Sequence, residues 1–93
     1  MKSLKITIEF WREGNLYLAR SPELDIVAQG NSLEEAKKNL LEVIEIQFEE
    51  MKELGTLDEF LLEAGYKSKD EILESEKEII GFDKSFVALE SMA

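Results

Sequence analysis

The sequence contains no cysteine and no histidine. Without cysteine the chain forms no disulfides and no thiolate metal sites. Without histidine it lacks the commonest general base and the commonest metal ligand, and a Ser-His or Cys-His nucleophile pair cannot exist. We therefore expect no catalytic residues and no metal or cofactor site, and we predict that the protein is not an enzyme.

Long apolar runs are absent as well. No run approaches the roughly 20 apolar residues that span a bilayer. The first eight residues, Met-Lys-Ser-Leu-Lys-Ile-Thr-Ile, alternate in polarity and do not form the continuous apolar core of a signal peptide. We therefore expect a cytoplasmic protein that has no membrane partner.

Positive charge is scarce. The chain has 11 Lys and Arg against 21 Asp and Glu, a net charge of −10. Residues 1–46 carry a net −2 and residues 47–93 a net −8, so the second half is the more acidic. Because phosphate backbones are bound mainly through Lys and Arg, we expect no direct contact with nucleic acid. The charge favours basic partners, although solubility alone is the simpler explanation.

Two weaker signals for chemistry have simpler structural explanations. Glu45 and Glu49 are four residues apart on a predicted helix and could share a metal, but no third ligand is evident, so a solvated helix face is favoured. Trp11 and Tyr17 could stack on bases, but base-stacking aromatics are usually interleaved with Lys and Arg. Here the neighbouring charges nearly cancel, so an oligomer contact or a satellite core is favoured.

The apolar residues that are present predict a small sheet. Residues 4–11 alternate without a break between apolar and polar side chains, the pattern of a half-buried strand. A turn at 12–15 leads to a second strand over 16–20, which Pro22 interrupts because proline lacks an amide donor. A third short strand over 26–29 ends at Gly30. Three strands with tight links predict an antiparallel meander.

A long helix follows the predicted sheet. Ser32 and Glu35 have the spacing of a capping box, and Gly55 has the position of a C-terminal cap. Between them the apolar side chains recur at helical spacing on one side. They are Leu33, Ala36, Leu40, Val43, Ile44, Phe48 and Met51.

The remaining residues predict a short tail. Thr56 and Glu59 form a second capping box that opens a helix through Ala64. Ser68 could cap a third helix over 70–80, and residues 85–90 predict a final strand. The expected fold is thus one α+β domain over residues 1–93. Its core, residues 1–55, is a three-stranded antiparallel β-meander followed by one long amphipathic helix packed on one sheet face. Residues 56–93 add a short helix and a C-terminal strand.

The first strand has two faces of different character. We expect Leu4, Ile6, Ile8 and Phe10 to pack against the long helix. The helix cannot cover the opposite face, to which we assign Lys5, Thr7, Glu9, Trp11, Tyr17, Ala19 and Val27. An uncovered patch with Trp and Tyr suits a partner or a second subunit. The candidate interface residues are Trp11, Tyr17, Arg20 and Glu23.

Residues 4–54 resemble the HicB-like antitoxin domain. The similar stretches are Ile-Thr-Ile-Glu-Phe (6–10), Tyr-Leu-Ala-Arg-Ser-Pro-Glu-Leu (17–24), Ala-Gln-Gly-Asn-Ser-Leu-Glu-Glu-Ala (28–36) and the helix that follows. The span 4–54 makes up about 55% of the chain. Residues 55–65 resemble the tail of short prokaryotic members. Many members carry a C-terminal DNA-binding domain, but residues 56–93 are too short or too acidic for one, so autorepression is not expected.

The resemblance implies that this chain neutralises a toxin. The implied partner is a small, basic HicA-like protein with a double-stranded-RNA-binding fold that cleaves or blocks mRNA, and family members often form dimers or higher homo-oligomers. The matched residues also have folding roles, since Pro22 sets a turn and Ser32 with Glu35 caps the helix. The main alternative is an orphan oligomeric scaffold of the same fold without a toxin. An enzyme or a nucleic-acid binder is the third alternative.

Overall fold

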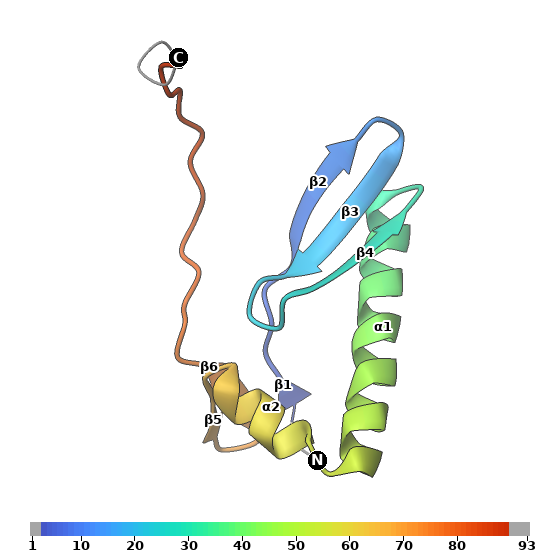
Figure 1. The fold of residues 1–93 in the computed structure, drawn as a ribbon, viewed down its shortest axis with the longest axis vertical. Coiled ribbons are helices and arrows are strands. Elements are labelled where there is room, and N and C mark those ends of the chain that lie inside the picture. Colours follow the sequence, from blue (N-terminus) through green and yellow to red (C-terminus); the bar gives the residue numbers. More distant parts are fainter. Residues whose placement is uncertain (1–2, 90–93) are drawn as a thin grey trace.

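The computed structural model describes residues 3–89 and contains two helices and six strands within them (Figure 1). The elements are, in order, β1 (Ser3–Leu4), β2 (Glu9–Glu13), β3 (Leu16–Ser21), β4 (Ile26–Gly30), α1 (Leu33–Leu54), α2 (Leu57–Glu63), β5 (Tyr66–Lys69) and β6 (Ile72–Ser75). The strands form two three-stranded sheets, β2-β3-β4 and β1-β6-β5. The predicted α+β order of antiparallel meander, long helix, short helix and C-terminal strand structure is confirmed.

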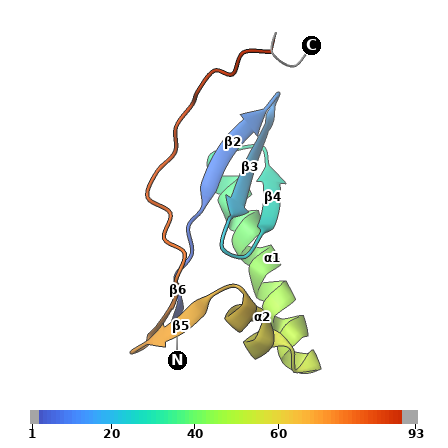
Figure 2. The same cartoon turned by 60° about the vertical axis from the view of Figure 1, so that its left-hand side comes forward.

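The meander β2-β3-β4 is antiparallel throughout, with β3 in the centre. Gly14 and Asn15 form the turn between β2 and β3, and Gly14 takes a positive φ of 60°, which glycine adopts without steric cost. Helix α1 packs on one face of this sheet, against β3 and β4 (Figures 1 and 2). Helix α1 does not cover the edge strand β2. Phe10 therefore remains 43% exposed, although it is paired with the fully buried Ala19.

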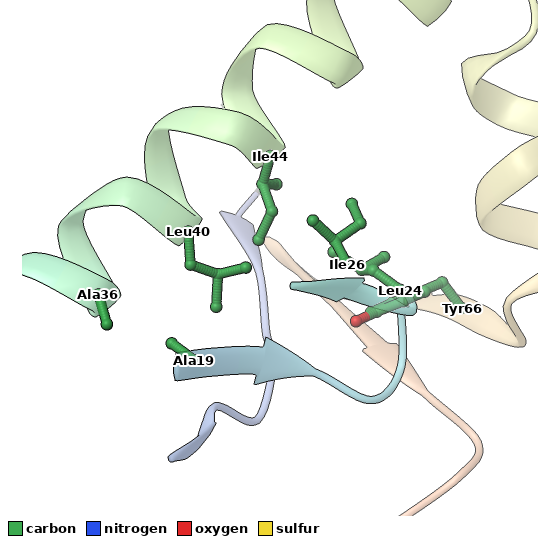
Figure 3. Close-up of a cluster of buried hydrophobic side chains, with 7 residues drawn as sticks. All are labelled: Ala19, Leu24, Ile26, Ala36, Leu40, Ile44 and Tyr66. Carbon is green, nitrogen blue, oxygen red and sulfur yellow. The ribbon is translucent and has the colours of Figure 1, made fainter. Parts of the chain in front are cut away.

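The core lies between α1, the meander and the C-terminal hairpin (Figure 3). Its buried apolar side chains are Ala19, Leu24, Ile26, Ala36, Leu40, Ile44 and Tyr66. Leu40 is the largest apolar side chain that is fully buried, and burial of a leucine contributes about 1.5–3 kcal/mol. The predicted spacing of Ala36, Leu40 and Ile44 on one helix face is confirmed.

Both ends of α1 are capped as their residues predict. The Ser32 hydroxyl accepts a hydrogen bond from the Glu35 amide at 3.0 Å. At the other end Gly55 has a φ of 75°, its amide donates to the Lys52 carbonyl, and the next amide, of Thr56, donates to the Met51 carbonyl. These two bonds form a Schellman cap. The helix ends here because Gly55 adopts the left-handed conformation.

The predicted capping box at Thr56 is wrong, although the short helix that it was expected to open is present. The Thr56 side chain makes no capping hydrogen bond to α2. Its amide is part of the α1 cap, and its hydroxyl turns back to the Met51 carbonyl at 3.4 Å. Thr56 therefore completes the first helix instead of capping the second.

The predicted single strand over residues 4–11 is divided in the structure. Ser3 and Leu4 pair in parallel with β6, while Glu9–Glu13 pair with β3. Between them the Thr7 amide donates to both carboxylate oxygens of Glu23, at 2.9 and 3.0 Å. The Glu23 side chain thus accepts the hydrogen bond that a neighbouring strand would otherwise accept. At this point the chain passes from one sheet to the other. Unbroken alternation along the sequence could not show this change of partner.

The predictions for the C-terminal part are wrong in position. Residues 70–80 do not form a helix, because β5 and β6 form an antiparallel hairpin whose turn places Asp70 at a φ of 58°. The part of the predicted strand 85–90 that the structure describes, residues 85–89, has no strand pairing, and Glu90 lies outside the described residues. The C-terminal strands are instead β5 and β6.

The Tyr66 side chain ties this hairpin to the start of the chain. Its ring is buried in the core and its hydroxyl donates to the Lys5 carbonyl at 2.9 Å. Burial and the nearby Glu23 carboxylate raise the pKa of Tyr66 to about 12. The phenol therefore remains a donor at neutral pH. Among residues 3–89, neither helix has the length and apolar character that a bilayer crossing requires.

Candidate partner-binding surface

The face of the meander opposite α1 is uncovered among the described residues (Figures 1 and 2). Directly paired residues in antiparallel strands point to the same face, so the register defines what we call the outer face. It consists of Glu9, Trp11, Glu13, Leu16, Leu18, Arg20, Val27 and Gln29. Trp11 is 37% and Val27 48% exposed. The outer face is therefore an exposed apolar strip flanked by acids.

Trp11 lies on this face, as predicted, and the candidate interface residue Arg20 lies there too, although the predicted faces did not place it there. The Trp11 indole Nε1 donates to Glu13 Oε1 at 3.3 Å. The Arg20 guanidinium contacts Glu9 at 3.3 Å and Asp25 at 3.0 Å, and its hydrogen bond with Asp25, followed by the charges of both acids, raises the pKa of Arg20. The only cation on the outer face is thus already paired with acids, and the face has no unpaired positive charge in the described chain.

Tyr17 does not share this face, and the prediction that placed Tyr17 and Ala19 beside Trp11 is wrong. Tyr17 pairs with Gly30 and packs against the core, while Ala19 is fully buried under α1. The two-residue turn pairs Glu13 with Leu16, so odd positions of β2 share a face with even positions of β3. A one-residue change in turn length reverses this relation, which explains the error.

Glu23 lies in the β3–β4 loop and supports the fold. Besides the Thr7 amide, its carboxylate accepts from the Thr7 hydroxyl at 2.7 Å and from the buried Ser21 hydroxyl at 3.4 Å. Partial burial opposes ionisation, but these hydrogen bonds outweigh it and lower the pKa of Glu23. A carboxylate that holds a main-chain amide is a poor choice for a contact residue, because a partner would compete for its acceptors.

Acidic side chains do not converge on a metal site within residues 3–89, where no group of three or more carboxylates has the required arrangement. Glu45 and Glu49 are exposed on α1. Their positions are those of a solvated helix face.

Sequence reasoning missed a groove beside β2. It has a volume of about 890 Å³ and lies between the edge of the meander, residues 7–12, and the C-terminal segment, with Ile79, Gly81, Phe82 and Lys84 on the far side. The signal available in the sequence was the cluster of apolar residues after position 78, which has no helical period and follows an acidic stretch. Only the fold shows that this segment runs alongside β2.

Comparison with known proteins found no relative of this chain. A scan against protein-family models, a search of the curated proteins and a search of the solved structures each found no match. The function of this chain is therefore inferred from its own residues and their geometry.

Proposed function

We propose that this chain is a HicB-like antitoxin that binds and neutralises a small, basic HicA-like toxin acting on mRNA. The proposal is supported by the order of the elements, because three antiparallel strands and a long Ser-capped helix follow one another as the resemblance implies. The proposed activity is binding alone, in the cytoplasm, without catalysis, cofactor, metal or nucleic-acid contact.

The observation that carries this proposal is the outer face of the meander. Trp11 lies at the centre of β2 with Glu9 and Glu13 on either side of it on the same face. An exposed aromatic side chain can anchor a partner, and the flanking carboxylates attract a basic surface. The chain as a whole has a charge of −10. Charge complementarity of this kind raises the rate of association and the specificity for a basic RNA-binding partner.

The residues that carry the resemblance support this proposal by their structural roles. Gly30 is required because a Cβ there would lie 2.6 Å from the Ala36 amide nitrogen, so β4 could not approach the start of α1. Pro22 lies in the β3–β4 turn and Ser32 caps α1. None of these residues is at the outer face. These three positions therefore have roles in the fold, and the proposed partner contacts lie on the outer face.

Co-expression tests the proposal. A neighbouring reading frame that encodes a short basic protein with a histidine in its second half would be expressed alone and with this chain. We expect growth arrest in the first case, relief in the second, and co-purification of the two proteins. Trp11→Ala should weaken the complex by about 10-fold or more, whereas Leu62→Ala, at a 74% exposed position on α2, should not. Toxicity that persists with no co-purification would count decisively against an antitoxin role.

The alternative, an orphan oligomeric scaffold of the same fold, is favoured by a different observation. Large apolar side chains are exposed along the C-terminal segment as well as on the outer face. A self-associating chain would have both surfaces even without a toxin partner. The co-expression experiment distinguishes the two proposals, because a scaffold would not relieve the growth arrest.

A further inference from the structure

Strand β2 forms an edge of the meander. It pairs with β3 on one side, and all five of its residues are exposed. Within residues 3–89 no backbone hydrogen bond joins its other side to residues 79–87. A strand edge with unpaired amide and carbonyl groups is a ready template for another strand.

The opposite edge of the meander is different. On β4 the Gln29 carbonyl accepts from the Asn39 side chain at 2.8 Å, and α1 packs closely against this strand. The edge at β2 is therefore the more accessible of the two for the addition of a strand.

The C-terminal segment, residues 79–89, has the side chains of a strand but no sheet of its own. Its large apolar residues are almost fully exposed: Ile80 91%, Phe82 90%, Phe86 106%, Val87 78% and Leu89 71%. The segment is extended and runs beside β2 in the same direction (Figures 1 and 2). Monomeric proteins rarely expose so many large apolar side chains in one place. These exposed side chains are therefore suited to bury against a further apolar surface.

The direction of the segment opposes its pairing with β2 of its own chain. The pair would be parallel, as the common direction in Figures 1 and 2 shows. Parallel pairing is slightly less stable per residue than antiparallel pairing, so closure within one chain would give the weaker of the two possible strand pairs. A segment from a second molecule is not bound by this direction and can run antiparallel to β2.

Direct pairing of β2 with β2 of a second copy is also unfavourable. The antiparallel register that pairs all five residues is centred on Trp11 and places Glu9 opposite Glu13 of the partner subunit. Like charges directly opposite each other destabilise a strand pair. The C-terminal segment has no acid between Lys84 and Leu89, and aromatic–aromatic and aromatic–β-branched pairs of its Phe and Val side chains with Phe10 and Trp11 would be favourable.

We infer that the chain forms a two-fold dimer in which the C-terminal segment of each copy pairs antiparallel with β2 of the other. The exchange is reciprocal, so both edges are paired and both segments are buried. The groove beside β2 is the space into which the partner's segment enters. This inference does not depend on the existence of a toxin.

Sedimentation velocity of the full chain over a range of concentrations tests the inference. We expect a dimer for the wild type. The double variant Phe86→Asp, Val87→Asp should raise the dimer Kd by about 30-fold or more. Its folding should not change, because both side chains are exposed. Leu62→Asp introduces one such charge at another exposed position, on α2, and should leave the dimer intact.

A mixture of isotope-labelled and unlabelled chains identifies the contact itself. Nuclear Overhauser effects filtered for contacts between labelled and unlabelled molecules should connect residues 84–89 with residues 9–13. A monomer whose segment is protected from hydrogen exchange would show closure within one chain and would overturn the inference. So would a dimer that survives the double substitution, because it would use another surface. Neither outcome bears on toxin neutralisation, which is measured separately.

Discussion

The Glu23 side chain illustrates how a candidate interface residue can also have a role in the fold. In the sequence it is a charged residue in a turn, next to a proline. In the structure its carboxylate receives the Thr7 amide and hydroxyl, and so fixes the point at which the chain leaves one sheet for the other. Its contribution is to stability, and it is sensitive to pH.

The pH dependence of this stabilisation follows from the direction in which folding shifts the Glu23 pKa. The pKa of Glu23 is lowered by folding from an ordinary value of 4.5. The ionised form is thus stabilised in the folded state, and the stabilisation is present above pH 4.5 and lost as the pH falls through the folded pKa. We expect Glu23→Gln to reduce the free energy of unfolding in urea at pH 7. The difference from wild type should shrink at pH 3.

The exposed Glu45 on α1 provides the matched control for this substitution. Glu45→Gln removes the same charge without touching Thr7, and should change stability by less than about 0.5 kcal/mol. A difference between wild type and Glu23→Gln that is the same at pH 7 and pH 3 would contradict the role assigned to the carboxylate.

At the scale of the element, two similar capping signals have different outcomes. Ser32 caps α1, while Thr56, with the same spacing to a glutamate, does not cap α2. The difference arises because Thr56 directly follows the left-handed Gly55 and its amide closes the Schellman cap of α1. A helix start that is immediately preceded by another helix end therefore cannot be judged from its own motif.

Substitution of both residues should separate these roles. Ser32→Ala is expected to lower the free energy of unfolding by about 1 kcal/mol, the usual value of an N-cap side chain. Thr56→Ala should lower it by less than about 0.5 kcal/mol, because the position is exposed and its hydroxyl makes only the 3.4 Å contact with Met51. Equal losses in chemical denaturation would show that Thr56 does cap α2.

At the scale of the whole molecule, Tyr66 joins the two sheets. Its ring completes the core beneath α1 and its hydroxyl holds the Lys5 carbonyl, 61 residues away in the sequence. The start of the described chain is thereby held against the hairpin β5-β6, and β1 can pair with β6.

Tyr66→Phe tests this connection because it removes the hydroxyl and keeps the ring. We expect a loss of about 1 kcal/mol at pH 7, as for a single internal hydrogen bond, and faster hydrogen exchange at the Lys5 amide, which pairs with the Leu73 carbonyl. Since folding raises the Tyr66 pKa from 10.0 to about 12, stability should also fall as the pH rises from about 10 through 12. That alkaline loss should be smaller in Tyr66→Phe.

Tyr17→Phe is the matched control, since within residues 3–89 the Tyr17 hydroxyl has no hydrogen-bond partner. It should change stability by less than about 0.5 kcal/mol. A stability of Tyr66→Phe equal to wild type would contradict the role of the hydroxyl.

The sequence by itself determined the elements that depend on neighbouring residues. Periodicity predicted the meander and α1, and local capping groups predicted where α1 begins and ends, because these interactions join residues only a few positions apart. The absence of cysteine and histidine likewise removed whole classes of chemistry, because a side chain that the chain lacks is missing from every possible fold.

Only the tertiary structure decided which strand pairs with which and which face each side chain occupies. Tyr17 lies under α1 because of the pairing across a two-residue turn, and residues 4–11 divide because Glu23, far along the chain, captures the Thr7 amide. Such choices depend on contacts between distant residues, which a pattern along the chain does not contain. The same reason explains why the groove beside β2 becomes visible only in the folded molecule.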